Sequence, residues 1–305
     1  MWRVVLAIVG SSGGRSWFRD PARFGLVFLL LLVGVAFRAW SEESDSLAAA
    51  RTAWEQRSDG FAGEWAEGER IGVAVAEYEA ALREAPASLE VHEELLRALY
   101  FQGTFTELSG AEVRAIFERG VEVSESAMRL LHGPGGVKKR QVADLVAEAA
   151  DNGRAGALHF WSAVHWGQWG DNQSMMAALR AGVATRLRDH GQVAMELDPM
   201  YDHAGPLRLL GRMHAIAPKV PTVTGWIKRE RGVELLESAL ELAPADPQIR
   251  LFLVEAWLDQ RPKKRAEAVD LLRSLVRDSP RRGLEVEDSF VLRDASELYR
   301  TLGYD

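Results

Sequence analysis

Residues 239–244 have the sequence ALELAP, and variants of this phrase recur as ALREAP at 81–86, AMELDP at 194–199 and, more weakly, LVRDSP at 275–280. Each copy ends an apolar helical pattern at a proline, which cannot continue a helix. The prolines of successive copies are 113, 45 and 36 residues apart. With a period of about 34 residues, the first gap corresponds to three repeat units, the second to one unit with an insertion, and the third to one unit. The repeat predicts a stack of helical hairpins.

The unit that follows Pro244 shows the pattern most clearly. Asp246 is a favourable N-cap, and Pro247 suits the first position of a helix. Apolar residues then recur every three or four positions, as on the buried face of a helix. A period of about 34 is the length of a tetratricopeptide repeat. We therefore predict an all-α, tetratricopeptide-like solenoid of about five hairpins, closed by a C-terminal capping helix at 287–302 without a hairpin partner.

Other signals place the individual helices. Ser109 and Glu112 have the spacing of a capping box, which predicts a helix over 111–131 paired with one over 88–102. We expect a second pair from 155–169 and 174–197. Gly211 follows a leucine, and a leucine-glycine pair is a feature of the tetratricopeptide repeat. The glycine there lets two helices approach closely. Three further helices are expected at 65–84, 138–150 and 231–243, and no segment after residue 41 has the pattern of a strand.

The N-terminus differs from the rest of the chain. Residues 24–37 carry no charge, four arginines precede them, and three acidic residues follow soon after them. Fourteen residues suit the apolar core of a signal peptide better than a spanning helix, which needs about 20. We expect residues 1–41 to direct export to the periplasm, either as a cleaved leader or as an inner-membrane anchor through 24–37. Residues 42–305 then form one α-solenoid domain.

Composition and motifs argue against several classes of chemistry. The chain has 305 residues, 27% of them charged, and a net charge of −7, which disfavours nucleic-acid binding. It has no cysteine, and its seven histidines do not fall at metal-ligand spacing: His159 and His165 lie on different faces of one predicted helix. No nucleophile motif or phosphate-binding loop occurs after residue 41. We expect no catalytic residue, no metal and no cofactor.

The segment LHFWSAVHWGQWG at 158–170 is unusually rich in rings. Trp161, His165 and Trp169 lie at positions i, i+4 and i+8 of one helix face. Two interpretations stay open. The rings pack the core of the solenoid, or they line an apolar cavity in which indole and imidazole groups meet the polar end of a lipophilic ligand.

Three segments together resemble the TatT family, the T-components associated with tripartite ATP-independent periplasmic (TRAP) transporters. They are LHFWSAVHWGQWGD at 158–171, AMELDPMYDHAGPLRLLGRMHAIAPKVP at 194–221 and RGVELLESALELAP at 231–244. The resemblance implies tetratricopeptide-like hairpins in the periplasm, a solute-binding protein as partner, an apolar ligand and assembly into a homotrimer. It supplies no catalytic residue. Members are commonly lipoproteins, whereas this chain has no cysteine to lipidate.

The resemblance favours a non-catalytic accessory component of a TRAP-type uptake system, with Trp161, His165 and Trp169 as ligand-binding residues. The alternative is a general tetratricopeptide scaffold that binds other proteins at the cell envelope. An enzyme is the third hypothesis, and it requires a buried carboxylate or histidine with a perturbed pKa in a cleft.

Overall fold

The structure is a computed structural model that describes residues 44–63, 65–220 and 223–304. These residues form thirteen α-helices and a short 3-10 helix, with no strand among them beyond an isolated bridge between Ala66 and Thr106. The predicted all-α class is confirmed. The helices are α3 (Asp45–Glu55), α4 (Gly68–Glu84), α5 (Leu89–Phe105), α6 (Gly110–His132), α7 (Val142–Ala149), α8 (Ala155–Asp171), α9 (Met175–Ala181), α10 (Val183–Leu197), α11 (Tyr201–Ile216), α12 (Arg229–Leu242), α13 (Pro247–Gln260), η2 (Pro262–Lys264), α14 (Arg265–Leu275) and α15 (Glu285–Thr301).

Several of these helices begin at the capping residues that the sequence predicts. Ser109 and Glu112 form the complete capping box at the start of α6. The Asp246 carboxylate accepts the backbone N–H of Ile249 at 2.9 Å, and Pro247 occupies the first turn of α13. Ser88 caps α5 in the same way. Each cap satisfies a backbone donor that would otherwise have no partner within the helix.

The single helix expected at 174–197 is wrong, because the segment is divided at Gly182 into α9 and α10. Gly182 has φ +68°, a left-handed conformation that costs glycine little. Its N–H bonds back to the carbonyl oxygens of Ala178 and Leu179, which ends α9. Helix α9 therefore ends there, and it contacts α8 and α10.

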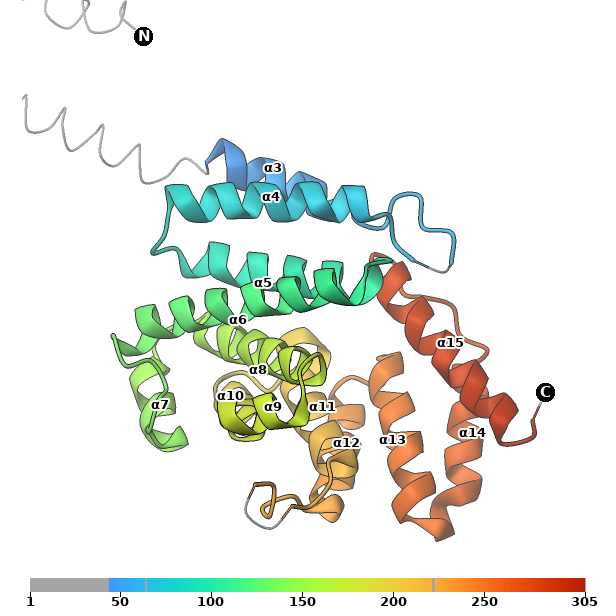
Figure 1. Cartoon of the computed structure of the whole chain (residues 1–305). Helices are drawn as coiled ribbons and strands as arrows, with labels where there is room; N and C mark the ends of the chain where they lie inside the picture. The colour runs from blue at the N-terminus through green and yellow to red at the C-terminus, as the bar shows by residue number, and fades with distance from the viewer. Residues whose placement is uncertain (1–43, 64, 221–222, 305) are drawn as a thin grey trace, which may run out of the picture. The chain divides into compact units, whose positions relative to one another are not determined.

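Neighbours in sequence are mostly neighbours in space. Helix α3 packs on α4, α4 on α5, and α5 on α6, and the same order continues from α11 to α14 (Figure 1). Helix α8 departs from this simple order, because it contacts α5, α6, α10 and α11 at once. It is the helix around which the middle of the chain is assembled.

Glycines let α11 and α12 approach closely, as the sequence predicted at Gly211. A Cβ atom on Gly211 would lie 2.8 Å from the Leu236 side chain on α12. On the opposite helix, a Cβ on Gly232 would lie 2.6 Å from the backbone nitrogen of Ala215. Backbone cannot move aside as a side chain can, so the crossing requires glycine at this point.

The C-terminal helix has more neighbours than the sequence indicated. Helix α15 packs on both α13 and α14. Its Phe290 also makes edge-to-face ring contacts with Trp65 and Phe105 near the ends of the first hairpins. Arg57 donates to the Glu287 carboxylate at 2.9 Å and to the Gly283 carbonyl oxygen at 2.6 Å. The last helix therefore joins the first hairpins to the last one (Figure 1).

None of the described helices is both long and apolar enough to cross a membrane. The stretch 24–37, for which an export or anchor role was predicted, lies outside the described residues. The described chain from Asp45 onward belongs to one compact unit.

Ala239 tests the assigned packing of α12. Its side chain is fully buried in a small cluster with Ala204, Leu207 and Ile249. Ala239→Leu adds three carbon atoms where there is no room for them, and we expect it to destabilise the fold by about 1–3 kcal/mol. Urea unfolding followed by circular dichroism measures this change. Ala115→Leu on the exposed face of α6 is the control, and equal midpoints for the two variants would contradict the assigned packing.

Candidate functional site

Helix α8 carries the residues that the sequence proposed for ligand binding. Nearly every side chain from Ala155 to Trp166 is buried, on all sides of the helix. Neighbouring helices cover each of these sides, namely α5, α6, α10 and α11. An unpaired polar group on a helix buried all round is costly, so the polar groups of α8 depend on partners from the neighbouring helices.

Trp161 lies on the side of α8 that faces α5 and α11. It is 5% exposed, and its ring centroid is 5.5 Å from that of Tyr100. The indole N–H donates to the Tyr201 hydroxyl oxygen at 2.7 Å, and that hydroxyl donates to the Glu93 carboxylate at 3.0 Å. The polar edge of Trp161 therefore ends a line of hydrogen bonds that leads to a charged group. We call Trp161, Tyr201 and Glu93 the indole line.

His165 also faces α5 and is fully buried. Its Nε2–H donates to the Leu96 carbonyl oxygen at 2.9 Å, while Nδ1 is buried and has no hydrogen-bond partner among the described residues. Burial lowers the pKa of His165 to about 4, so the ring is neutral at pH 7. Its ring packs so closely on α6 that a Cβ on Gly120 would lie 2.0 Å from Nδ1.

Trp169 lies near the C-terminal end of α8 and is only partly buried. Its ring meets Trp166 edge to face at 5.6 Å, and the Arg186 guanidinium of α10 lies 4.1 Å from the Trp166 centroid. The three predicted site residues thus contact different neighbours. Trp161 and His165 share α5, whereas Trp169 belongs with Trp166 at the helix end.

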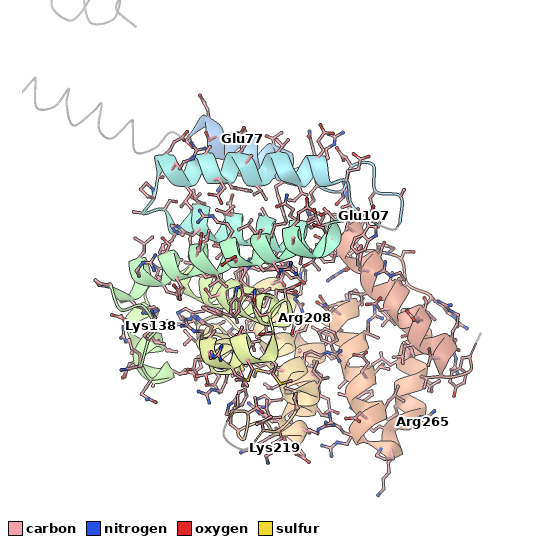
Figure 2. The ribbon with its side chains drawn as sticks, viewed as in Figure 1. Glu77, Glu107, Lys138, Arg208, Lys219 and Arg265 are labelled. Carbon is pink, nitrogen blue, oxygen red and sulfur yellow. The ribbon has the colours of Figure 1, made fainter. Side chains whose placement is uncertain are left out.

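Charged side chains gather beside the indole line, where α11, α13 and α15 meet. The buried carboxylate of Asp246 accepts bonds from Arg208 on α11 and Arg281 before α15, each at 3.3 Å. Arg208 also donates to Asp202 at 2.6 Å, and Arg281 donates to Asp288 at 2.8 Å. Figure 2 shows Arg208 toward the middle of the view, whereas Lys138, Lys219 and Arg265 lie at its margins. Opposite charges are paired, so this region binds its helices together without a large net charge.

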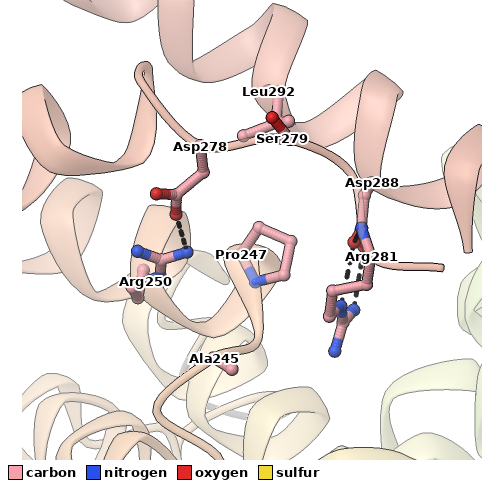
Figure 3. A pocket seen from close by; sticks show the side chains of 8 residues that line it. All are labelled: Ala245, Pro247, Arg250, Asp278, Ser279, Arg281, Asp288 and Leu292. Carbon is pink, nitrogen blue, oxygen red and sulfur yellow. Dashed lines mark hydrogen bonds and ion pairs between the residues drawn. The ribbon is translucent and has the colours of Figure 1, made fainter.

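A pocket of about 300 Å³ opens next to these pairs. Figure 3 shows Arg250 facing Asp278 and Arg281 facing Asp288 on its walls, with Pro247 between them. Because each guanidinium already faces a carboxylate, the pocket offers a small, electrically balanced space rather than an anion site.

A second group of polar side chains crosses the interior on the other side of α8. His132 Nε2 lies 2.9 Å from His159 Nε2, and His159 Nδ1 lies 3.0 Å from His190 Nδ1. His132 Nδ1 lies 2.7 Å from a Glu148 carboxylate oxygen. We call Glu148, His132, His159 and His190 the histidine chain. Its nitrogens pair in a row instead of converging on one point, and the described residues contain no cluster suited to a metal ion.

The sequence pattern does not predict the histidine chain, because His159 and His165 were the histidines compared for a metal site and they lie on different faces of α8. His159 and His190 lie on α8 and α10, which correspond to the predicted pair 155–169 and 174–197, and His132 ends α6 before them. That pairing could bring His159 and His190 near each other, but it does not supply the direction of each ring.

No family model matches this sequence, and no curated protein matches it either.

Trp161 and Trp169 differ in burial, and truncation should reflect the difference. We expect Trp161→Ala to destabilise the fold by about 3–5 kcal/mol, because it empties a buried site and leaves the Tyr201 hydroxyl without its donor. Trp169→Ala should cost clearly less, because the ring is already partly in water. Chemical unfolding of both variants measures the two values, and a larger loss for Trp169→Ala would contradict the described environments.

The buried histidines make stability depend on pH. Burial lowers the pKa of His165 to about 4 and that of His190 to about 3, against an ordinary value of 6.5, and it lowers the pKa of His159 as well. Below pH 6.5 the unfolded chain binds protons that the folded chain excludes, so stability is complete above 6.5 and falls as the pH falls. Each ring contributes about 1.4 kcal/mol per pH unit in that window.

We therefore expect the melting temperature to decrease steadily between pH 7 and pH 5. His203 is exposed, so His203→Gln is the control and should keep the wild-type pH slope. A melting temperature that stays constant over this range would show that the buried rings take up protons in the folded state.

Proposed function

We propose that this protein is a non-catalytic, tetratricopeptide-like accessory component of a periplasmic TRAP-type uptake system. In this proposal it binds an apolar ligand, a solute-binding protein, or both. Residues 1–41 export the chain, and the domain that follows works as a monomer or as a homo-oligomer such as a trimer. The observation that carries the ligand role is the indole line on the inner side of α8, in the segment where the family resemblance is closest.

The chemistry beside Trp161 supports a ligand with an apolar body and a polar end. The faces of Trp161 and Tyr100 supply apolar surface, and burial raises the pKa of Tyr100, so its hydroxyl stays neutral. The Tyr201 hydroxyl, held between the indole N–H and Glu93, supplies a polar group of fixed orientation. Few, well-oriented polar groups within apolar walls are typical of small-molecule sites.

The helical hairpins support the tetratricopeptide-like part of the proposal. α5 pairs with α6, α11 with α12 and α13 with α14, each through a short or inserted connection. Pairing of this kind agrees with the repeat period of the sequence.

A general scaffold for envelope proteins is the second candidate, and α9 favours it. This short helix has no buried residue, and its Met175, Met176 and Leu179 are 79%, 56% and 42% exposed. Flexible apolar side chains at a surface are typical of protein-binding sites. In this alternative, partners bind at α9 and the interior serves only the fold.

The ligand proposal is tested by titrating the full-length protein with cis-parinaric acid, a fluorescent fatty acid. We expect saturable binding that weakens about fivefold in Trp161→Phe, because this change removes one hydrogen bond of about 1 kcal/mol from the indole line. Trp257→Phe is the matched control, since Trp257 is also buried and donates to a carboxylate, that of Glu237, away from α8. Absence of saturable binding, or equal loss in both variants, would contradict the ligand role.

The partner proposal is tested with a TRAP-type solute-binding protein encoded beside this gene. We expect the two purified proteins to co-elute in size-exclusion chromatography. Loss of co-elution in Met175→Asp with retained parinarate binding would favour the scaffold interpretation of α9. If no transporter genes lie beside this gene and the two proteins form no complex, the TRAP assignment is wrong.

A further inference from the structure

The histidine chain connects four separate elements. Glu148 lies on α7, His132 ends α6, His159 lies on α8 and His190 lies on α10. The three rings are 6%, 0% and 2% exposed, in the order His132, His159 and His190, whereas the Glu148 side chain is 41% exposed. The row therefore has one end at the surface and the other in the interior.

An anionic Glu148 determines where each hydrogen lies in the neutral row. Its bond with His132, with a smaller contribution from Arg140 at 2.6 Å, holds the pKa of Glu148 below its ordinary value, so the carboxylate can only accept. His132 therefore donates from Nδ1, and its Nε2 accepts from His159 Nε2–H at 2.9 Å. His159 Nδ1 in turn accepts from His190 Nδ1–H at 3.0 Å.

The same row can hold one more proton without losing a bond. When His132 is an imidazolium, its Nδ1–H still donates to Glu148 and its Nε2–H donates to His159 Nε2. His159 then donates from Nδ1 to His190 Nδ1, and His190 carries its hydrogen on Nε2. Each contact still joins one donor to one acceptor, but both ring-to-ring bonds have reversed their direction.

The hydrogens of the two states balance. From the neutral to the charged row, one hydrogen crosses from His159 Nε2 to His132 Nε2, and one crosses from His190 Nδ1 to His159 Nδ1. His190 Nε2 takes one proton from the solvent. The row therefore gains one proton in total, and the positive charge lies at the opposite end from the nitrogen that gained it.

The surroundings favour His132 as the carrier of that charge. The Glu148 carboxylate lies 2.7 Å from His132 Nδ1, whereas among the described residues no carboxylate is bonded to the ring of His159 or His190. Burial lowers the pKa of both inner rings, and Arg186 lowers that of His190 further. A charge on either inner ring is therefore less stable than one on the ring beside the carboxylate.

Other charged groups lie at the surface end of the row. Arg140 pairs with Glu148, which keeps the carboxylate ionised and weakens its attraction for the ring. Glu90, Asp151 and Arg154 line a shallow hollow together with Glu148, and Arg154 pairs with Glu90 at 2.5 Å. Imidazole is more basic than a carboxylate, with ordinary pKa values of about 6.5 and 4.3, so the added proton stays on the ring.

The charged groups near the inner end are already paired. Arg186 lies 3.4 Å from Glu125 of α6, and Asp189, which follows His190 in the chain, lies 2.6 Å from Arg188. None of them offers His190 a free carboxylate. The inner end therefore takes part in the row as a neutral ring in both states.

We propose that the histidine chain is a proton-binding site, which holds one proton as the His132 imidazolium against Glu148 and reverses the tautomers of the neutral His159 and His190. Binding at the surface end thereby changes a group inside the protein, because His190 Nε2 is an acceptor in the neutral row and a donor in the charged row. The site is independent of the ligand and partner roles proposed above.

The first test follows the rings of the full-length chain, labelled with 15N-histidine, in long-range 1H–15N spectra between pH 8.5 and pH 5.5. The chain has seven histidines, so single His→Gln variants assign the signals. As the pH falls, we expect the His132 ring to become charged. With the same midpoint, His159 should change from the Nε2–H to the Nδ1–H form, and His190 from the Nδ1–H to the Nε2–H form.

Two other buried rings are controls in the same spectra. His92 Nδ1 lies 2.7 Å from the Ser88 carbonyl oxygen, and His165 Nε2 lies 2.9 Å from that of Leu96. A carbonyl oxygen only accepts, so each ring must keep its hydrogen on that nitrogen. Both should keep one tautomer through the midpoint of the row, which separates an exchange at His159 from a general loosening of the interior.

A free histidine in water favours the Nε2–H form, so an Nδ1–H ring at His159 is not the default. A charged His159 ring would overturn the proposal. So would a His159 ring that keeps one tautomer while His132 becomes charged, or a His132 ring that stays neutral over the whole range.

The second test removes the anion with Glu148→Gln, a change at an exposed side chain that leaves the three rings in place. We expect the midpoint of the row to fall by about one pH unit, a tenfold weaker binding of the proton. Asp144→Asn is the matched control, because it removes an exposed carboxylate from the same helix and should leave the midpoint nearly unchanged. Equal shifts in the two variants, or no shift in Glu148→Gln, would overturn the proposal.

Discussion

Burial of α8 on all sides from Ala155 to Trp166 is the constraint on which the rest of the structure depends. Polar groups on a helix side that is covered cannot bond to water, so neighbouring helices supply partners for most of them, with His165 Nδ1 as an exception. Tyr201 accepts from Trp161, Leu96 accepts from His165, and His159 is bonded on both ring nitrogens. These bonds determine how α5, α6, α10 and α11 are placed around α8.

The same constraint explains where small residues are required. Gly120 on α6 leaves room for the His165 ring, and Gly191 on α10 leaves room for leucines of α11. Close approach of helices brings the rings of α8 within reach of their partners on the neighbouring helices. The interior is therefore tightly packed on the His165 side. On the Trp161 side, Tyr100 and Tyr201 are only partly buried, and this is the side for which we propose a ligand.

Much of the helical framework could be predicted from the sequence. Prolines after apolar stripes, the capping box at Ser109 and the Asp246 cap are local signals, and the helices begin and end near them. Two features were not predicted, one for a local reason and one for a long-range reason. Gly182 was not recognised as a left-handed residue that divides a helix, because glycine inside a helical pattern is often tolerated. The terminal helix gave no sign that Phe290 and Glu287 would contact the first hairpins, which lie more than 180 residues earlier in the chain.

The sequence by itself determined the all-α class, the repeat period and the helix caps, because these depend on residues within one or two helical turns of each other. It also marked α8 as exceptional through its density of rings. Only the tertiary structure decided that Trp161, His165 and Trp169 have separate neighbours, and that three histidines on three helices form one hydrogen-bonded row with Glu148. Such contacts depend on the rotation of each helix about its axis, and that rotation is determined by packing against several neighbours at once.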